Sequence, residues 1–205
     1  MMGTIERLIQ RVQQTQHGFK DIRAAADEVI TSITPEDNIR LAKKLFASDV
    51  HQGRVLATFI LGLLAATSRE SLGFLRTRVS QDMDWRVQET LAKAFDNYCA
   101  DTGYEKALPT IRDWLKDPNP KVRRAVTEGL RVWTSRPYFR DHPDIAVQLL
   151  SRLRADDSEY VRKSVGNALR DISRKHGELV RAELHQWDVS KKSVKQTYRL
   201  ARRFL

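Results

Sequence analysis

The chain carries one motif twice, as Lys121-Val122-Arg123-Arg124-Ala125-Val126 and as Tyr160-Val161-Arg162-Lys163-Ser164-Val165. A turn signal precedes each copy, residues 117–120 (Asp-Pro-Asn-Pro) before the first and residues 156–158 (Asp-Asp-Ser) before the second. The two repeat valines are 39 residues apart, a spacing typical of helical repeats. Because apolar residues four apart lie on one helix face, each motif predicts the start of a helix with a buried stripe.

The same stripe, an aliphatic residue followed by apolar residues four and eight positions later, runs through most of the chain. It occurs as Ile22/Ala26/Ile30, Val55/Phe59/Leu63, Val87/Leu91/Phe95, Val122/Val126/Leu130 and Val161/Val165/Leu169, with a shorter copy at Val194/Tyr198. Shorter amphipathic segments lie between the stripes, at 39–46, 72–79, 107–115, 145–153 and 179–184. No segment alternates with the period of a strand. The pattern predicts an all-α protein, a right-handed α-solenoid of about six HEAT-like repeats that forms one domain over residues 1–205.

Composition favours a polyanionic partner. The 205 residues contain 36 Lys and Arg against 26 Asp and Glu, a formal charge of +10. The single cysteine, Cys99, excludes an internal disulfide and a thiolate metal cluster. The five histidines show no metal-ligand spacing and no glycine-rich phosphate loop is present, so we expect neither a metal nor a cofactor. Without a signal core or a bilayer-length apolar run, we expect a cytoplasmic protein with no membrane contact. The repeat architecture is expected to be a monomer.

The cations near the predicted helix starts have two interpretations. They are Arg123, Arg124, Arg162, Lys163, Lys191, Lys192 and Lys195. Equivalent positions of stacked repeats line up on one face, so these side chains could contact the phosphates of double-stranded DNA. Alternatively, the arginines pair with acidic residues of a neighbouring repeat, and Asp117, Asp156 and Asp157 are placed for that role.

Two tryptophans and several carboxylates are candidates for a reactive site. Trp85 lies one position outside a stripe and Trp133 lies beyond the last apolar residue of another, so both could face a ligand. Glu89 occupies the position that Arg124 and Lys163 hold in their repeats. It lies four residues after Trp85 and therefore on the same helix face. Asp84 and Asp171 are further candidates, although surface carboxylates are commonly solvated or paired.

Residues 84–187 resemble the DNA alkylation repair proteins of the AlkC and AlkD type. The resemblance is carried by residues 117–124 (Asp-Pro-Asn-Pro-Lys-Val-Arg-Arg), by Glu128-Gly129-x-Arg131 and above all by residues 157–173 (Asp-Ser-Glu-Tyr-Val-Arg-Lys-Ser-Val-Gly-Asn-Ala-Leu-Arg-Asp-Ile-Ser). It implies HEAT-like repeats, a phosphate-facing Arg124, a functional Asp171 and a catalytic carboxylate at Glu89 or Asp84 beside Trp85. Trp133 does not align cleanly with the family's tryptophan, and Asn167 stands where the AlkD branch has a second lesion-facing tryptophan.

Three functions remain open at this point. The resemblance implies a monofunctional DNA glycosylase that excises purines alkylated at N3 or N7. Such bases are cationic and leave readily, so a carboxylate and an aromatic face suffice to stabilise the developing sugar cation. A non-catalytic protein that grips damaged or branched DNA, and a protein-interaction scaffold with purely structural arginines, are the alternatives.

Overall fold

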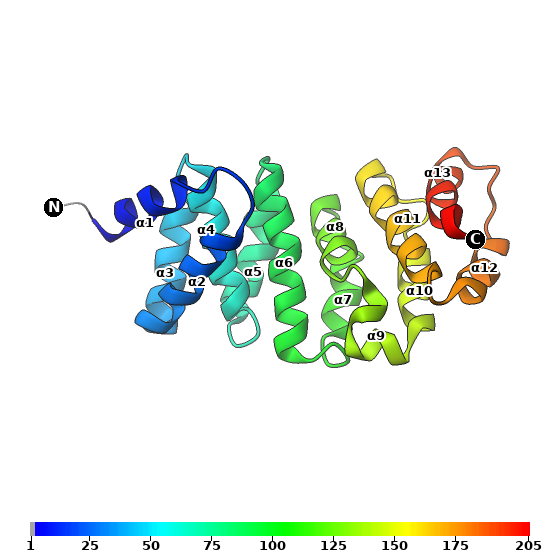
Figure 1. Cartoon of the computed structure of the whole chain (residues 1–205), viewed down its shortest axis with the longest axis horizontal. Helices are drawn as coiled ribbons and strands as arrows, with labels where there is room; N and C mark the ends of the chain where they lie inside the picture. The colour runs from blue at the N-terminus through cyan, green and yellow to red at the C-terminus, as the bar shows by residue number, and fades with distance from the viewer. Residues whose placement is uncertain (1–2) are drawn as a thin grey trace. The chain divides into compact units, whose positions relative to one another are not determined.

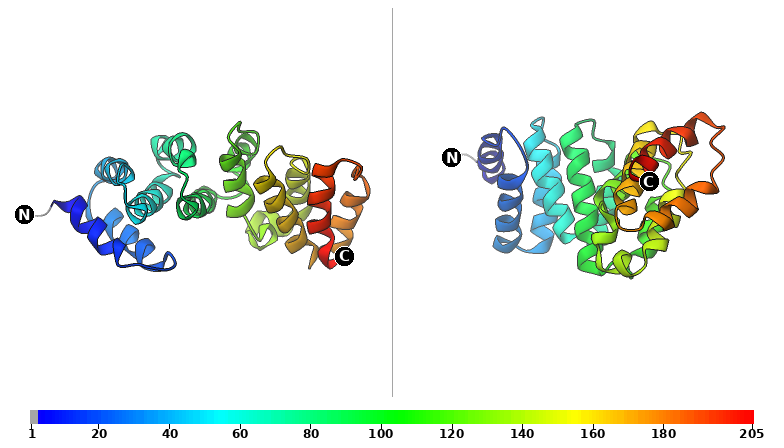
Figure 2. Two further views of the ribbon diagram at one scale, coloured as in Figure 1. Left: turned by 90° about the horizontal axis from the view of Figure 1, so that it is seen from above. Right: turned by 45° about the vertical axis from the view of Figure 1, so that its right-hand side comes forward.

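The computed structural model describes residues 3–205, which form helices and no strand, so the predicted all-α class is confirmed. The chain divides into two compact units, Met1–Asp101 and Thr102–Leu205, where the sequence alone suggested one domain. Figures 1 and 2 show the helices of each unit side by side. The first unit contains α1 (Thr4–Gln13), α2 (Lys20–Ser32), α3 (Pro35–Phe46), α4 (His51–Leu64), α5 (Arg69–Thr77), η1 (Val79–Gln81) and α6 (Trp85–Thr102), which ends at the boundary.

The second unit continues the pattern of helix pairs. It contains α7 (Leu108–Trp114), α8 (Pro120–Gly129), η2 (Trp133–Ser135), α9 (Pro137–Asp141), α10 (Pro143–Ser151), α11 (Glu159–Ser173), α12 (Gly177–His185), α13 (Lys192–Ala201) and η3 (Arg202–Phe204). The short helices η2 and α9 are inserted between α8 and α10. This insertion explains why the valines of α8 and α11 are further apart than the valines of the other repeats.

Local sequence fixes where the helices begin. Thr34 accepts a hydrogen bond from the backbone N–H of Asp37, and Pro35 occupies the first turn of α3. Asn119 and Pro120 start α8 in the same way, with the Asn119 side chain accepting from the backbone N–H of Lys121. Each cap satisfies a backbone donor that has no partner inside the helix. Proline is suited to the first turn because the backbone N–H that it lacks would have no acceptor within the helix there. The helix starts predicted at these turns are confirmed.

The predicted stripes form the core. All three residues of the Val87, Val122 and Val161 stripes are fully buried. In the first unit α4 packs against α2, α3 and α5, and in the second α11 packs against α8, α10, α12 and α13. The Val122 and Val161 stripes therefore face neighbouring repeats of the same unit, as HEAT-like repeats require.

The sequence pattern placed Val55 at the position that Val122 holds in its repeat, and the hydrogen bonds of the neighbouring arginines show that this placement is wrong. Arg54 donates hydrogen bonds to the carbonyl oxygens six and five residues before it, those of Ser48 and Asp49. Arg123 makes the same two contacts at the same offsets, with Asp117 and Pro118. Arg54 is therefore the counterpart of Arg123, and Gly53, not Val55, is the counterpart of Val122.

Candidate nucleic-acid interface

The first cation of each motif is a structural clamp between repeats. The Nε and one terminal nitrogen of Arg123 each donate to a carboxylate oxygen of Asp156 at 2.7 Å. The side chains of this pair are only 14% and 4% exposed. Arg54 makes the matching ion pair with Asp82 at 2.6 Å. The structural interpretation therefore holds for Arg123, which is not placed to contact a phosphate.

Arg162 has the same arrangement with a neutral partner. Its Nε donates to Oε1 of Gln196 on α13 at 2.8 Å, and a terminal nitrogen donates to the carbonyl oxygens of Asp156 and Asp157. Asp156 thus fills the predicted partner role through its carboxylate, which pairs with Arg123, whereas Asp157 contacts Arg162 of its own repeat through a backbone oxygen. Because the Arg162–Gln196 bond leaves the guanidinium charge without a carboxylate, Arg162 still contributes positive charge to its surroundings.

The second cation of the α11 motif points to solvent. The side chain of Lys163 is 53% exposed and pairs with Glu159 one helical turn earlier at 2.6 Å. Lys191, Lys192 and Lys195, at the start of α13, are also exposed. Arg124, at the matching position on α8, is half-buried. The exposed lysines remain candidates for phosphate contacts because an exposed i,i+4 pair such as Lys163–Glu159 is weak and can rearrange.

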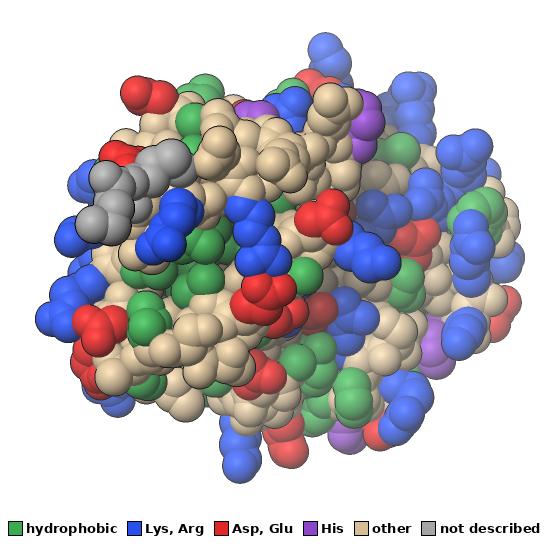
Figure 3. Space-filling model, turned by 60° about the vertical axis from the view of Figure 1, so that its left-hand side comes forward, with side chains coloured by type: hydrophobic (Ala, Val, Ile, Leu, Met, Phe, Trp, Pro, Cys, Tyr) green, Lys and Arg blue, Asp and Glu red, His purple; other side chains and the backbone are tan. Residues whose placement is uncertain are grey.

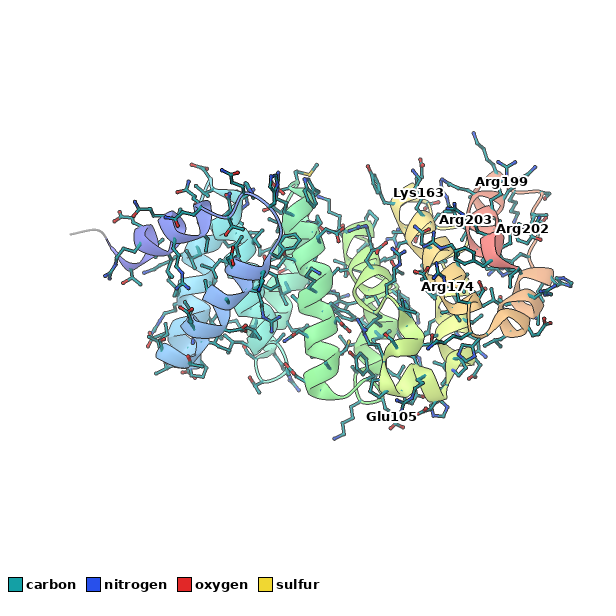
Figure 4. All side chains as sticks on the ribbon, viewed as in Figure 1. Glu105, Lys163, Arg174, Arg199, Arg202 and Arg203 are labelled. Carbon is teal, nitrogen blue, oxygen red and sulfur yellow. The ribbon has the colours of Figure 1, made fainter. Side chains whose placement is uncertain are left out.

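Lys163, Lys192 and Lys195 meet at a groove between α11 and α13. The groove has a volume of about 830 Å³ and is lined by Glu159, Arg162, Lys163, Lys192, Ser193, Lys195, Gln196, Arg199 and Leu200. Five of its lining residues are cationic and one is acidic. Figure 4 shows Lys163 and Arg199 at this end of the second unit, and Glu105 apart from them in the turn before α7. By contrast, the face of the first unit visible in Figure 3 mixes basic and acidic side chains.

The start of α6 presents the other candidate residues. Trp85 is 62% exposed, and the Arg86 guanidinium lies 4.9 Å from the centroid of the Trp85 ring. Asp84 accepts the backbone N–H of Arg86 at 2.8 Å and pairs with its guanidinium at 3.2 Å. Glu89 is half-buried one turn further along. The sequence alone did not single out Arg86, although its place directly after Trp85 was the available signal.

Asp171 is engaged in ion pairs. Its carboxylate accepts from Nε of Arg131 at 2.7 Å and from Arg170 at 2.9 Å, and the side chain is 12% exposed. Burial alone would raise the pKa of Asp171, but the hydrogen bonds from Arg131 and Arg170 outweigh it and hold the pKa below the ordinary value. Asp171 is thus an ion-paired and mostly buried carboxylate, and its catalytic role stays a prediction.

Trp133 belongs to the core, which corrects the expectation that it faces a lesion. Its side chain has no exposed surface, and its ring packs against Phe139 with centroids 4.9 Å apart. Trp114 and Trp187 are also buried. The segment after α8 turns back as η2 and α9, and this fold brings Trp133 inward. Trp85 is thus the tryptophan of this chain that a ligand can reach.

Residues 3–205 contain neither a metal-binding cluster nor a membrane-spanning helix. No group of histidine, cysteine and carboxylate side chains within this range is arranged to hold a metal ion. None of the helices in this range combines the length and the apolar character needed to cross a membrane.

The chain matches the family model for the DNA alkylation repair enzyme over residues 17–204. The structure of AlkD2 from Streptococcus mutans is similar to it, with 48% identity, a TM-score of 0.96 and coverage of 98% of this chain and 97% of that one. The Pseudomonas fluorescens alkylpurine DNA glycosylase AlkC, solved bound to DNA containing an abasic site analog, shares the fold. Its TM-score is 0.54 at 20% identity, and the match covers 99% of this chain and 64% of that one.

A relative from Bacillus subtilis (strain 168), the uncharacterized protein YhaZ, is 39% identical over 87 residues, which are 40% of this chain and 24% of YhaZ. This chain therefore matches only about a quarter of the length of that relative. The match to the family model, by contrast, covers nearly the whole chain. On that basis the chain belongs to the DNA alkylation repair enzyme family.

Proposed function

We propose that this protein binds double-stranded DNA through the α11–α13 groove and excises cationic N3- or N7-alkylated purines at the start of α6. In this proposal it is a monofunctional DNA glycosylase that works as a monomer in the bacterial cytosol, without metal or cofactor. The observation that carries the excision proposal is the exposed Trp85 with two carboxylates beside it, Asp84 and Glu89, in a chain of the alkylation repair family.

The charge of the groove supports the choice of DNA. Lys163, Lys192 and Lys195 are exposed on two neighbouring helices, with Arg162 and Arg199 beside them. Lysines and arginines that neutralise phosphates release counterions, and this release drives sequence-independent binding. The AlkC structure, which shares this fold, holds DNA. Arg123, also a candidate from the sequence, is left out because Asp156 holds it.

Within the excision proposal, Glu89 is the first catalytic candidate because of its position on the helix, and Asp84 is the alternative. The Asp84 carboxylate caps the start of α6 and pairs with Arg86. Glu89 lies one turn further along the face that carries Trp85, where a negative charge would stabilise the developing sugar cation. Trp85 would lie against the lesion. Alkylated purines are good leaving groups, so the mechanism needs no general acid.

A second candidate function is DNA binding without excision. The observation that favours it is the burial of Trp133, because only one of the two predicted lesion-facing aromatics is exposed. A single aromatic surface is enough to contact a base but does not enclose it. The two functions make the same prediction for duplex binding and differ in base release.

Salt dependence of duplex binding tests the groove. Affinity for a DNA duplex should fall by about 0.9 log unit per log unit of salt for each phosphate contacted. Lys195→Glu should flatten that slope by about one contact or more. Lys106→Glu is the matched control, an exposed lysine in the turn that also holds Glu105, away from the groove. Equal slopes for the two variants would remove the groove from the proposal. An affinity that does not respond to salt would exclude phosphate contacts altogether and favour a protein scaffold.

Base release tests the chemistry. Duplex DNA carrying N7-methylguanine and N3-methyladenine should release free methylpurine in buffer with EDTA. Glu89→Gln should bind the same duplex but release base about a hundredfold more slowly, the cost of about 3 kcal/mol of transition-state stabilisation. Asp84→Asn should have a smaller effect. If the wild-type protein binds the methylated duplex and releases no base above the spontaneous rate, the binding function stands and the excision function does not.

A further inference from the structure

We propose that a small pocket beside Trp85 binds one unpaired, unmodified nucleotide, with the base against the Trp85 ring and the phosphate at Arg86. The pocket lies entirely within the first unit and has a volume of about 170 Å³. It shares Trp85 with the proposed excision site but requires no excision, so it goes beyond the proposed function.

Three segments far apart in the sequence build the pocket. Residues 15–19 of the α1–α2 loop form one wall, the first turn of α4 (His51, Gln52) forms another, and the start of α6 (Trp85, Arg86) forms the third. A cavity of about 150 Å³ is enough to hold benzene. At about 170 Å³ the pocket is slightly larger than that, so it limits the ligand to a single flat base at most and excludes a base pair.

The loop that closes the pocket has a defined conformation. Gly18 has a φ of 78°, in the left-handed region that glycine adopts without strain. The next residue, Phe19, packs edge-to-face on Phe59 of α4 with ring centroids 6.3 Å apart, and the Lys93 ammonium lies 5.8 Å from the Phe19 ring. These contacts hold the loop against α4 and α6, which favours a preformed pocket.

The aromatic wall fits a base. Trp85 is 62% exposed, unusual for a large aromatic side chain, and it borders the pocket. Base stacking on exposed aromatic rings tolerates any base because every base has a flat face. Arg86, over the Trp85 ring at 4.9 Å, places a guanidinium next to the position of a stacked base. A guanidinium is the usual partner of a phosphate.

Charge selects against an alkylated base in this pocket. Arg86 is a cation, and none of the lining residues is a carboxylate. Asp84 lies behind Arg86 and offsets part of its charge through their ion pair. A cationic purine in this pocket would be repelled by the guanidinium, whereas a neutral base with its phosphate would not, so a lesion held against Trp85 would have to lie outside the pocket. The pocket therefore suits an ordinary nucleotide better than the lesion itself.

The remaining polar residues suit the edge of a base. Gln16, Gln52 and His51 line the pocket. Burial, followed by the charge of Arg86, lowers the pKa of His51, so the ring is neutral at pH 7. A neutral imidazole donates one hydrogen bond and accepts another, and a glutamine amide does both. Together they could pair with the donors and acceptors that an unpaired base exposes.

The test uses NMR detection of the indole N–H groups of the full chain. The Trp85 signal is identified by its loss in Trp85→Phe, and the probes are dAMP, inorganic phosphate, a duplex with one unpaired adenine and the matching fully paired duplex. We expect dAMP or the duplex with the unpaired adenine to shift the Trp85 signal, and phosphate alone to leave it in place. Binding by dAMP alone identifies a free nucleotide as the ligand, and binding by the unpaired adenine identifies a nucleotide within a strand.

Variants separate this proposal from the others. Because Trp85→Ala and Trp85→Phe lack the indole signal, binding by all variants is measured by isothermal titration calorimetry with the probe that shifts Trp85. Arg86→Gln and Trp85→Ala should each weaken binding of the unpaired nucleotide about tenfold, and Trp85→Phe should retain most of it. Tyr160→Ala, which removes an aromatic residue 74% exposed in the second unit, should have no effect. Release of methylpurine by the wild type is measured separately, so a failure of excision does not decide nucleotide binding, and a failure of nucleotide binding does not decide excision. The proposal is overturned if no probe shifts Trp85, if the fully paired duplex shifts it as strongly as the duplex with the unpaired adenine, or if Trp85→Ala binds like the wild type.

Discussion

Replacing Arg123 with methionine should destabilise the second unit without weakening DNA binding. Arg123 donates two hydrogen bonds of 2.7 Å to Asp156 and two more to the carbonyl oxygens of Asp117 and Pro118. Methionine fills much of the same space but donates nothing. It leaves the Asp156 carboxylate, 4% exposed, with the backbone N–H of Ser158 as its donor.

The size of the effect follows from that burial. Removing one partner of a buried ion pair typically costs about 3–5 kcal/mol because the remaining charge is uncompensated. This cost is a large fraction of the roughly 5–15 kcal/mol that stabilises an ordinary domain. Asp156→Asn in the same chain should recover part of the loss, because it removes the charge that methionine leaves unpaired. The two single changes should therefore be non-additive.

Urea unfolding followed by circular dichroism measures the stability, and the salt dependence of duplex binding measures the DNA contact. Lys163→Met is the matched comparison, because Lys163 is the exposed cation of the same motif one repeat later. It should cost less than about 0.5 kcal/mol of stability and should flatten the salt dependence. The clamp interpretation is refuted if Arg123→Met is as stable as the wild type and its binding loses salt dependence by about one phosphate contact.

Two further predictions concern packing and pH. A Cβ added at Gly166 would lie 2.6 Å from the Cβ of Leu200, so Gly166→Ala should separate α11 from α13 and cost about 1–3 kcal/mol in urea unfolding. Gly73→Ala, with nothing within 4 Å, should instead stabilise α5 by up to about 1 kcal/mol. Because ion pairs lower the pKa of Asp171 in the folded state, its contribution is present above the unfolded pKa of about 3.9 and is lost as pH falls through the folded value. Asp171→Asn should therefore be less stable than the wild type by about 1–3 kcal/mol at pH 7, and the difference should shrink below about pH 4; a difference independent of pH would contradict this.

Hydrophobic periodicity predicted the repeats where one face of a helix is buried. The stripes that start at Val87, Val122 and Val161 have a single possible phase because polar residues flank them, and all three are in the core. On α4, by contrast, every residue from 55 to 62 is buried, because α2, α3 and α5 surround that helix. An apolar pattern without a polar face has no unique phase, so the alignment at Val55 could not be read correctly from the pattern.

The candidate site depended on contacts that the sequence does not specify. Trp85 and Trp133 each lie outside a stripe, yet one is exposed and the other is in the core. The difference arises because the chain after α8 folds back through η2 and α9 and covers Trp133 with Phe139. Likewise, the partner of Arg123 lies 33 residues away and is brought close only by repeat packing. Pairing between repeats was one of the two interpretations of the arginines, but sequence alone could not choose between them.

The hydrogen bonds give the two cations of the motif different tasks. The residue directly after the repeat valine points back to the preceding turn and across to the next repeat, and Arg123 and Arg162 both do this. The following residue lies at the position where Lys163 reaches solvent. In α6 these two positions hold Gln88, which bonds to the carbonyl oxygens of Val79 and Asp82, and Glu89. The clamp position is thus kept with a neutral side chain, while the second position changes from a cation to an anion. An anion there disfavours phosphate and favours a positively charged ligand, so the charge of Glu89, more than any feature of the fold, is what the excision proposal requires.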